Sequence, residues 1–409
     1  MTGPRGRPAE TGRQTSGGGR WSWRDDGAWQ AGFLLGSALG AVATVLGRRA
    51  ERAARRGLVD WPRAEEFAIQ QLRHAPGTLA RADIEATEPV YAAAMASIVP
   101  RLSEALETEL PGVVERVSVV DRAAWVSANV ATFAQLLGRI EGDLLDQVVP
   151  VGGGLAKASV AIANRYLTTR QIGFLLGFLG QRVLGQYDLT LLSAESVPGR
   201  LLFVEENIRQ TGRALDLPLD PFRSWIALHE TTHAFEFEAH PWLRPYLAER
   251  LERQLAAFSK DASTLGRDAM KQLGRVLRGE GQGLHWMERL MGEEQLRLFR
   301  ETQAVMSLLE GFSDYIMDEV GRDLVPDVER ISARFHERRE HRSPFERAIM
   351  RLTGMDLKME QYRKGERFVS AIAKTAGPAA LRKLWESPET LPRDGEIEAP
   401  DRWLARVMS

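Results

Sequence analysis

Two histidines four positions apart, with a glutamate directly after the first, lie in the apolar segment Trp225–Phe235. On an α-helix, residues four apart share one face, one turn above the other. His229 and His233 can therefore direct two imidazole rings at one metal ion, with Glu230 on the flank of the pair. This arrangement suits a tetrahedral zinc ion and a carboxylate placed to take a proton from water.

The sequence also indicates where a helix around this motif begins and ends. Asp220 is a good N-cap residue, and Pro221 suits the first helical position, where its missing N–H costs nothing. Pro241 is expected to end the helix just after His240. In the alternative interpretation there is no metal, and the two motif histidines are partly buried and hydrogen-bonded to carbonyl groups.

A zinc site with two imidazoles needs a third protein ligand. Glu236 is unsuitable, because seven residues along a helix from His229 correspond to about 10 Å of rise. The segment Met306–Met317 is apolar on nearly all sides, which is typical of a buried helix, yet it carries Glu310 and Asp314 on one face. Buried carboxylates need cationic or hydrogen-bonding partners. We expect Glu310 to bind zinc and Asp314 to accept an N–H from a metal-binding histidine.

Gly311 lies inside this predicted helix, where glycine is about 1 kcal/mol less favourable than alanine. Such a cost is tolerable if the helix must pack closely against the motif helix, and a close approach is therefore expected there. In the alternative interpretation, the two carboxylates of this helix form structural ion pairs with arginines.

The combination of His-Glu-x-x-His with a later Glu-x-x-x-Asp resembles the glutamate-ligated zincins, the thermolysin-like class. More closely, the chain resembles a bacterial family of zincin-like zinc metallohydrolases, some of whose members carry a label linking them to the biosynthesis of a deazaflavin coenzyme. The resemblance covers roughly Leu58 to the C-terminus. It runs through Val59–Trp61, Arg182–Asp188, the motif helix with Pro241–Arg244, Ser307–Gly311, Gln361–Phe368 and Ser387–Pro392. It implies a zincin-like hydrolase but no substrate, and nothing in these residues supports a role in the coenzyme pathway.

Composition sets further limits on the class of protein. The chain has 409 residues, 44% of them hydrophobic, which is enough for a large core and two or three subdomains. The net charge of −1 gives no sign of nucleic-acid binding. Because there is no cysteine, disulfides and thiolate zinc ligands are excluded, and the sequence gives no sign of an oxidising compartment.

The N-terminal region contains a candidate membrane anchor. Residues 1–27 are expected to be a disordered tail, and residues 28–47 are uncharged and just long enough to cross a bilayer. The arginine-rich stretch that follows, up to residue 57, would lie on the cytoplasmic side and leave the C-terminal region in the cytoplasm, tethered to the inner face of the membrane. Because residues 28–47 are rich in alanine and glycine, a soluble helix or a disordered tail is the alternative.

The rest of the chain is predicted to be α+β and predominantly α-helical. Residues 58–150 form an N-terminal helical subdomain, and residues 151–409 form a zincin-like catalytic region with a small antiparallel sheet or hairpin. Tyr187–Leu192 and Arg200–Val204 read as its two strands, joined by the loop Ser193–Gly199. We expect this hairpin to bind extended substrates along its edge. The alternative is that it only covers the core.

The expected activity is hydrolysis of a peptide or another amide, with one zinc ion per chain and Glu230 as general base. Tyr362 is the first candidate for the donor that stabilises the oxyanion, and Tyr187 is the second. Two other functions remain open at this point. One is a non-catalytic scaffold protein stabilised by zinc, and the other is an amidohydrolase acting on a small molecule.

Overall fold

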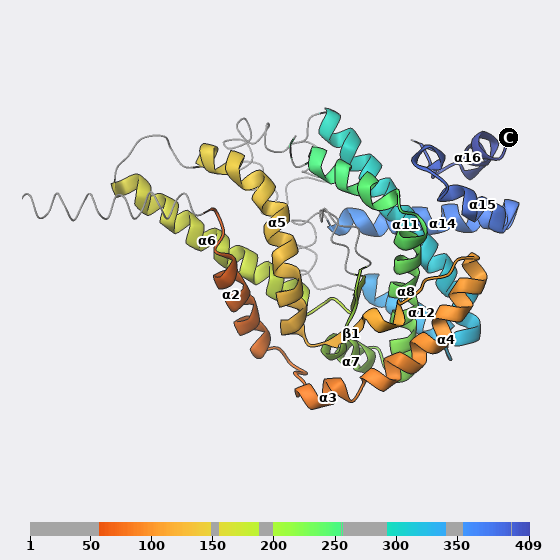
Figure 1. The fold of residues 1–409 in the computed structure, drawn as a ribbon, viewed down its shortest axis with the longest axis horizontal. Coiled ribbons are helices and arrows are strands. Elements are labelled where there is room, and N and C mark those ends of the chain that lie inside the picture. Colours follow the sequence, from red (N-terminus) through yellow and green to blue (C-terminus); the bar gives the residue numbers. More distant parts are fainter. Residues whose placement is uncertain are drawn as a thin grey trace, which may run out of the picture.

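The structure is a computed structural model that describes residues 57–148, 155–187, 199–254, 256, 293–340, 355–393 and 395–409. This part of the chain is mostly helical and contains one small sheet (Figure 1), which confirms the predicted α+β, predominantly helical class. The predicted tail 1–27 and the apolar segment 28–47 lie outside the described residues. Within the described ranges, no helix is long and apolar enough to cross a membrane.

The elements follow one another along the chain in a helix-rich order. The helices are α2 (Trp61–Arg73), α3 (Arg81–Glu85), α4 (Glu88–Leu106), α5 (Arg122–Val148), α6 (Leu155–Gly180), α7 (Glu205–Ala214), α8 (Leu219–Ala239), α11 (Glu293–Leu324), α12 (Val328–Glu340), α14 (Met355–Ala376), α15 (Pro378–Leu384) and α16 (Pro400–Val407). Short 3₁₀ helices span Val114–Arg116 and Pro388–Thr390, and the strands are β1 (Val117–Val120), β2 (Gly185–Tyr187) and β3 (Leu201–Val204).

The sheet has three strands in the order β1-β3-β2. Strand β2 pairs antiparallel to β3, with Tyr187 opposite Leu201, which confirms the predicted antiparallel pairing. Of the predicted strand Tyr187–Leu192 only Tyr187 belongs to the described residues, and of the predicted loop Ser193–Gly199 only Gly199 does. Strand β1 pairs parallel to β3, with Val117 also opposite Leu201. The sheet is therefore mixed, and its parallel strand was not predicted, because a four-residue strand with a distant partner leaves little signal in the sequence.

The central strand β3 separates two apolar layers. Leu201 and Phe203 belong to the larger core, whereas Leu202 and Val204 belong to the smaller one, as expected when successive strand residues point to opposite faces. Helices α2, α5 and α6 supply the smaller core, and α4, α7, α8, α11, α12, α14, α15 and α16 supply the larger one. Helix α4, from the predicted N-terminal subdomain, thus shares a core with the motif helix. The boundary near residue 150 stays a prediction.

The long helices α11 and α14 meet backbone to backbone at two glycines. A Cβ on Gly311 would lie 2.7 Å from the Gly365 carbonyl oxygen, and a Cβ on Gly365 would collide with the Ser307 carbonyl oxygen. The close approach expected at Gly311 is therefore present, but its partner is α14 and not the motif helix. That expectation was wrong about the neighbour, because spacing along one helix does not reveal which other helix reaches it.

Candidate metal centre

The motif lies on helix α8, which is buried along most of its length. The helix begins at Leu219 with Pro218 as N-cap, so the predicted cap at Asp220 was wrong; Asp220 instead pairs with Arg223 at 2.6 Å. It ends at Ala239, directly before His240 and Pro241, close to the predicted end. Most of its inward-facing residues are apolar, and this packing holds the motif residues in fixed positions against α4 and α11.

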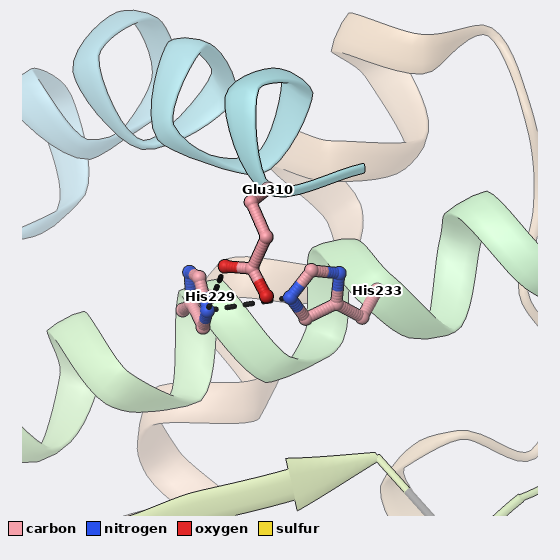
Figure 2. A group of neighbouring side chains, drawn as sticks. All are labelled: His229, His233 and Glu310. Carbon is pink, nitrogen blue, oxygen red and sulfur yellow. Dashed lines mark hydrogen bonds and ion pairs between the residues drawn. The ribbon is translucent and has the colours of Figure 1, made fainter. Parts of the chain in front are cut away.

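Three side chains from two helices converge at one point. His229 and His233 extend from α8, and Glu310 extends from α11 toward both rings (Figure 2). The two Nε2 atoms are 3.3 Å apart, and His229 Nε2 lies 3.8 Å from Glu310 Oε2. Nitrogen ligands of a tetrahedral zinc ion, each about 2.0–2.1 Å from the metal, are separated by about 3.3 Å. The donor set therefore fits zinc in both chemistry and spacing.

The far nitrogen of each ring is held by a neighbouring side chain. His233 Nδ1 lies 2.7 Å from Glu236 Oε2, and His229 Nδ1 lies 3.0 Å from Ser313 Oγ. Such outer partners fix a ring's orientation and tautomer, which leaves Nε2 to face a metal. Each Nε2 accordingly points to the centre of the cluster.

Neither of these outer partners, Glu236 and Ser313, was predicted from the sequence in this role. Glu236 was considered only as a metal ligand, although its spacing of three residues from His233 could have suggested a contact on the same helix face. Ser313 carried no signal of its own. Asp314 is partly buried, and its negative charge contributes to raising the pKa of Glu236. Its predicted hydrogen bond to a metal-binding histidine stays a prediction.

Glu230 is buried beside the cluster and contacts strand β2. Its Oε2 accepts a hydrogen bond of 3.0 Å from the Tyr187 backbone N–H. Gly185 permits this approach, because a Cβ there would lie 2.6 Å from Glu230 Cγ. Burial raises the pKa of Glu230 to about 7 against the opposing charge of His233, and Glu310 adds to the rise. A carboxylate with a pKa near neutrality is well suited to exchange protons at physiological pH.

His233 and Glu236 form a buried pair in which the pKa of each partner is raised. Burial raises the pKa of Glu236 to about 7, opposed by His233. Burial of the His233 ring acts to lower its pKa, but the carboxylates of Glu236, Glu310 and Glu230 outweigh it and raise the pKa to about 10. Because a metal binds the neutral imidazole, zinc must compete with this proton.

The two tyrosines proposed as oxyanion donors have different outcomes. The Tyr187 hydroxyl donates to Glu238 Oε1 at 2.8 Å, and burial together with Glu238 raises its pKa to about 12. Its backbone N–H, and not its hydroxyl, is the group that meets Glu230. Tyr362 belongs to α14, but its side chain lies outside the described part. Both roles stay predictions.

Comparison with known proteins agrees with this site. A mostly helical fold with a converging His-His-Glu cluster, built on a His-Glu-x-x-His helix, is the architecture of a zincin. The chain belongs to the zincin-like metallopeptidase family, whose model matches residues 59–404. It is similar to a crystal structure from Chloroflexus aurantiacus, described as that of a candidate hydrolase with a novel fold. The two chains are 35% identical with a TM-score of 0.63, over 85% of this chain and 98% of the other. A search of curated proteins found no match.

Family and neighbour together indicate a zinc hydrolase. This agrees with the family resemblance noted in the sequence and with the expected metal. The class of substrate is a separate question.

Proposed function

We propose that this protein is a zinc-dependent hydrolase that cleaves amide bonds, most simply those of peptides. The observation that carries the proposal is the buried carboxylate of Glu230 beside the His229, His233 and Glu310 cluster. A purely structural zinc site has no use for a carboxylate that lies beside the ligands without being one of them. The side chains of these three residues are also 14–19% exposed, so a substrate can approach, whereas structural zinc sites are closed.

The residues of the chain then have distinct tasks. When bound, zinc lowers the pKa of water toward about 7 and polarises a carbonyl oxygen. Glu230 accepts a proton from water as the water oxygen attacks the carbonyl carbon, and it passes that proton to the leaving nitrogen. Glu236 and Ser313 keep the two imidazole rings oriented. The Tyr187 N–H holds Glu230 in position.

Strand β2 favours a peptide over a small molecule as substrate. Among the strands of the described residues it lies at the edge of the sheet, in the order β1-β3-β2, and its Tyr187 N–H donates to Glu230. An extended peptide can add to such an edge through backbone hydrogen bonds, which would bring its scissile bond close to the base. The alternatives are an amidohydrolase acting on a small molecule and a non-catalytic zinc-stabilised scaffold.

The test combines metal analysis with hydrolysis of an internally quenched peptide library by the full chain. We expect about one zinc per chain, lost in Glu310→Ala. Glu230→Gln should keep its zinc and lose turnover by about 10²- to 10⁴-fold, the range typical of general bases. Glu249→Gln, an exposed glutamate paired with Arg253, is the matched control and should behave as the unmodified protein does.

Three outcomes would reject parts of the proposal. Normal turnover in Glu230→Gln removes Glu230 from the chemistry. Absence of zinc after purification without chelators and zinc re-addition rejects the metal centre itself. Zinc at one per chain, with no cleavage of peptides by the unmodified protein, favours the amidohydrolase or the scaffold.

A further inference from the structure

Tyr187 is hydrogen-bonded to helix α8 through both its backbone and its side chain. Its backbone N–H donates to Glu230 Oε2 at 3.0 Å, and its hydroxyl donates to Glu238 Oε1 at 2.8 Å. Glu230 and Glu238 are eight residues apart on α8, which corresponds to about 12 Å along the helix axis. The side chain of Tyr187 is buried and stacks on the ring of Phe237. Tyr187 therefore connects the candidate base to a second carboxylate of the same helix.

This second carboxylate is held by Arg116, the last residue of the 3₁₀ helix before β1. Arg116 Nη1 and Nη2 donate to the two oxygens of Glu238 at 2.6 and 2.9 Å, and both side chains are partly buried. Arg116 also donates to the carbonyl oxygens of Gly199 and Gly112, at 2.7 and 3.0 Å. The Gly199 N–H in turn donates to the Tyr187 hydroxyl at 3.3 Å. The ion pair thus joins three separate segments of the chain to α8.

The ion pair is better suited to fixing positions than to adding stability. Taking two charges partly out of water costs much of what their attraction returns. The planar guanidinium of Arg116, in contrast, holds the carboxylate of Glu238 in one orientation through two parallel hydrogen bonds. Burial, together with Glu238, raises the pKa of Tyr187 to about 12, so the hydroxyl remains a donor at neutral pH.

We propose that Arg116 and Glu238 are positioning residues for Glu230 and that they act through Tyr187. The ion pair fixes the Tyr187 hydroxyl, the ring carries this constraint to the backbone of β2, and the N–H of the same residue keeps Glu230 beside the cluster. The inference rests on the proposed function, in which Glu230 is the base. It also gives the Tyr187 hydroxyl a role other than stabilising an oxyanion.

Hydrogen–deuterium exchange of the full chain, resolved to single amides by mass spectrometry, tests whether the ion pair holds the contact with the base. Three variants each remove one link: Arg116→Gln, Glu238→Ala and Tyr187→Phe. In each, the amide of residue 187 should exchange at least about tenfold faster, the change expected when one hydrogen bond to a charged group weakens. Circular dichroism confirms folding, and Tyr187→Phe, which removes a single hydroxyl, carries the test if Arg116→Gln does not fold.

Two controls separate positioning from a general loss of structure. The Val204 amide of β3 donates to the carbonyl oxygen of Leu184, directly before β2, at 2.8 Å and should exchange at an unchanged rate in all variants. Arg101→Gln removes an exposed arginine that pairs with Glu104 and Asp323, and it should change the exchange of neither amide.

Peptide turnover is the second measurement. In Glu238→Ala, kcat should fall by about tenfold to 10²-fold, the larger value corresponding to a displacement of the base by about 1 Å. KM and zinc content should stay unchanged, because the base acts only in the transition state. Glu238→Gln keeps an oxygen that can accept from the Tyr187 hydroxyl, so it should recover part of the lost kcat. A purely structural role would lower stability and leave the kcat of the folded protein unchanged.

Three results would overturn the inference. Unchanged exchange at residue 187 in all three variants means that the ion pair does not hold the contact with Glu230. Equal acceleration at Val204 means that the sheet as a whole has loosened. Faster exchange at residue 187 with unchanged kcat means that the base works without this contact. If the unmodified protein does not cleave peptides, the proposed function fails, and the exchange rates still decide whether the ion pair holds the contact.

Discussion

The contact between α11 and α14 predicts that two Gly→Ala substitutions in one helix will have opposite effects. In Gly311→Ala, the new Cβ lies 2.7 Å from the Gly365 carbonyl oxygen and closer still to the backbone of the next peptide. Ordinary contact needs roughly 3.5 Å. The shortest distances, 2.3 Å to Gly365 C and to Glu366 N, must therefore grow by about 1.2 Å, and no side chain is available to rotate away.

The size of the effect follows from two opposing terms. Overpacking against an immovable backbone costs about 3 kcal/mol, the upper part of the usual range. Replacing glycine by alanine in a helix interior recovers about 1 kcal/mol. The net loss of stability in Gly311→Ala is therefore about 2 kcal/mol. Because Glu310 is the adjacent residue, its carboxylate should shift as well and zinc should bind more weakly.

Gly321 in the same helix supplies the control. A Cβ there would lie 3.4 Å from Leu228 Cδ2 and from Val328 Cγ2, the far ends of side chains that can adjust. Gly321→Ala should thus be neutral or stabilising by up to about 1 kcal/mol. Urea denaturation gives the free energy of unfolding of each variant, and competition with a chromophoric chelator gives its zinc affinity. Equal stability of the two variants would refute the backbone contact between α11 and α14.

Three other predictions follow from the site and from the C-terminal region. Gly185→Ala should keep its zinc but lower turnover about 10²-fold, because the new Cβ would lie 2.6 Å from Glu230 Cγ and displace the base. Peptide hydrolysis together with metal analysis tests this, and unchanged turnover would contradict it. Zinc affinity should fall as pH falls, because the proton on His233, with a pKa of about 10, competes with the metal. Calorimetry in buffers of different ionisation enthalpy should detect the proton that zinc releases, and a zinc affinity independent of pH between about 6 and 8 would contradict this prediction. Hydrogen bonds from Arg406 lower the pKa of Glu396 in the folded protein. The stability that this ion pair contributes is therefore present above the unfolded pKa of about 4.3 and is lost as pH falls through the lower folded pKa. Glu396→Gln should lower the melting temperature at pH 7 more than at pH 3, and an equal decrease at both pH values would contradict this.

The part of the site that lies on one helix could be predicted from local sequence. His229, Glu230 and His233 are placed by the 3.6-residue repeat alone, so their shared face follows once the segment is helical. Glu310 could be proposed because an ionisable residue in an apolar helix needs a partner. Its position 3.8 Å from His229 depends on how α11 packs on α8, which the sequence did not reveal.

Which side chains and strands become neighbours was harder to predict than which residues share one face of a helix. Glu236 and Ser313 lie at the two Nδ1 atoms and neither was predicted there, while the hydrogen bond expected between Asp314 and a metal-binding histidine stays a prediction. A carboxylate three residues from a histidine and one on another helix are equally plausible partners until the side-chain conformations are known. Strand β1 is a similar case, because the parallel partner of Val117 is Leu201, far along the chain.

The sequence by itself determined the chemistry of the centre, the helical class of the fold and the location of the buried helices, because residue type and periodicity are local properties. Tertiary structure alone decided that Gly311 meets α14, that β2 carries the Tyr187 N–H to Glu230, and that Ser313 of α11 meets His229 of α8. These are contacts between segments distant in the chain, and they depend on packing that no local pattern encodes.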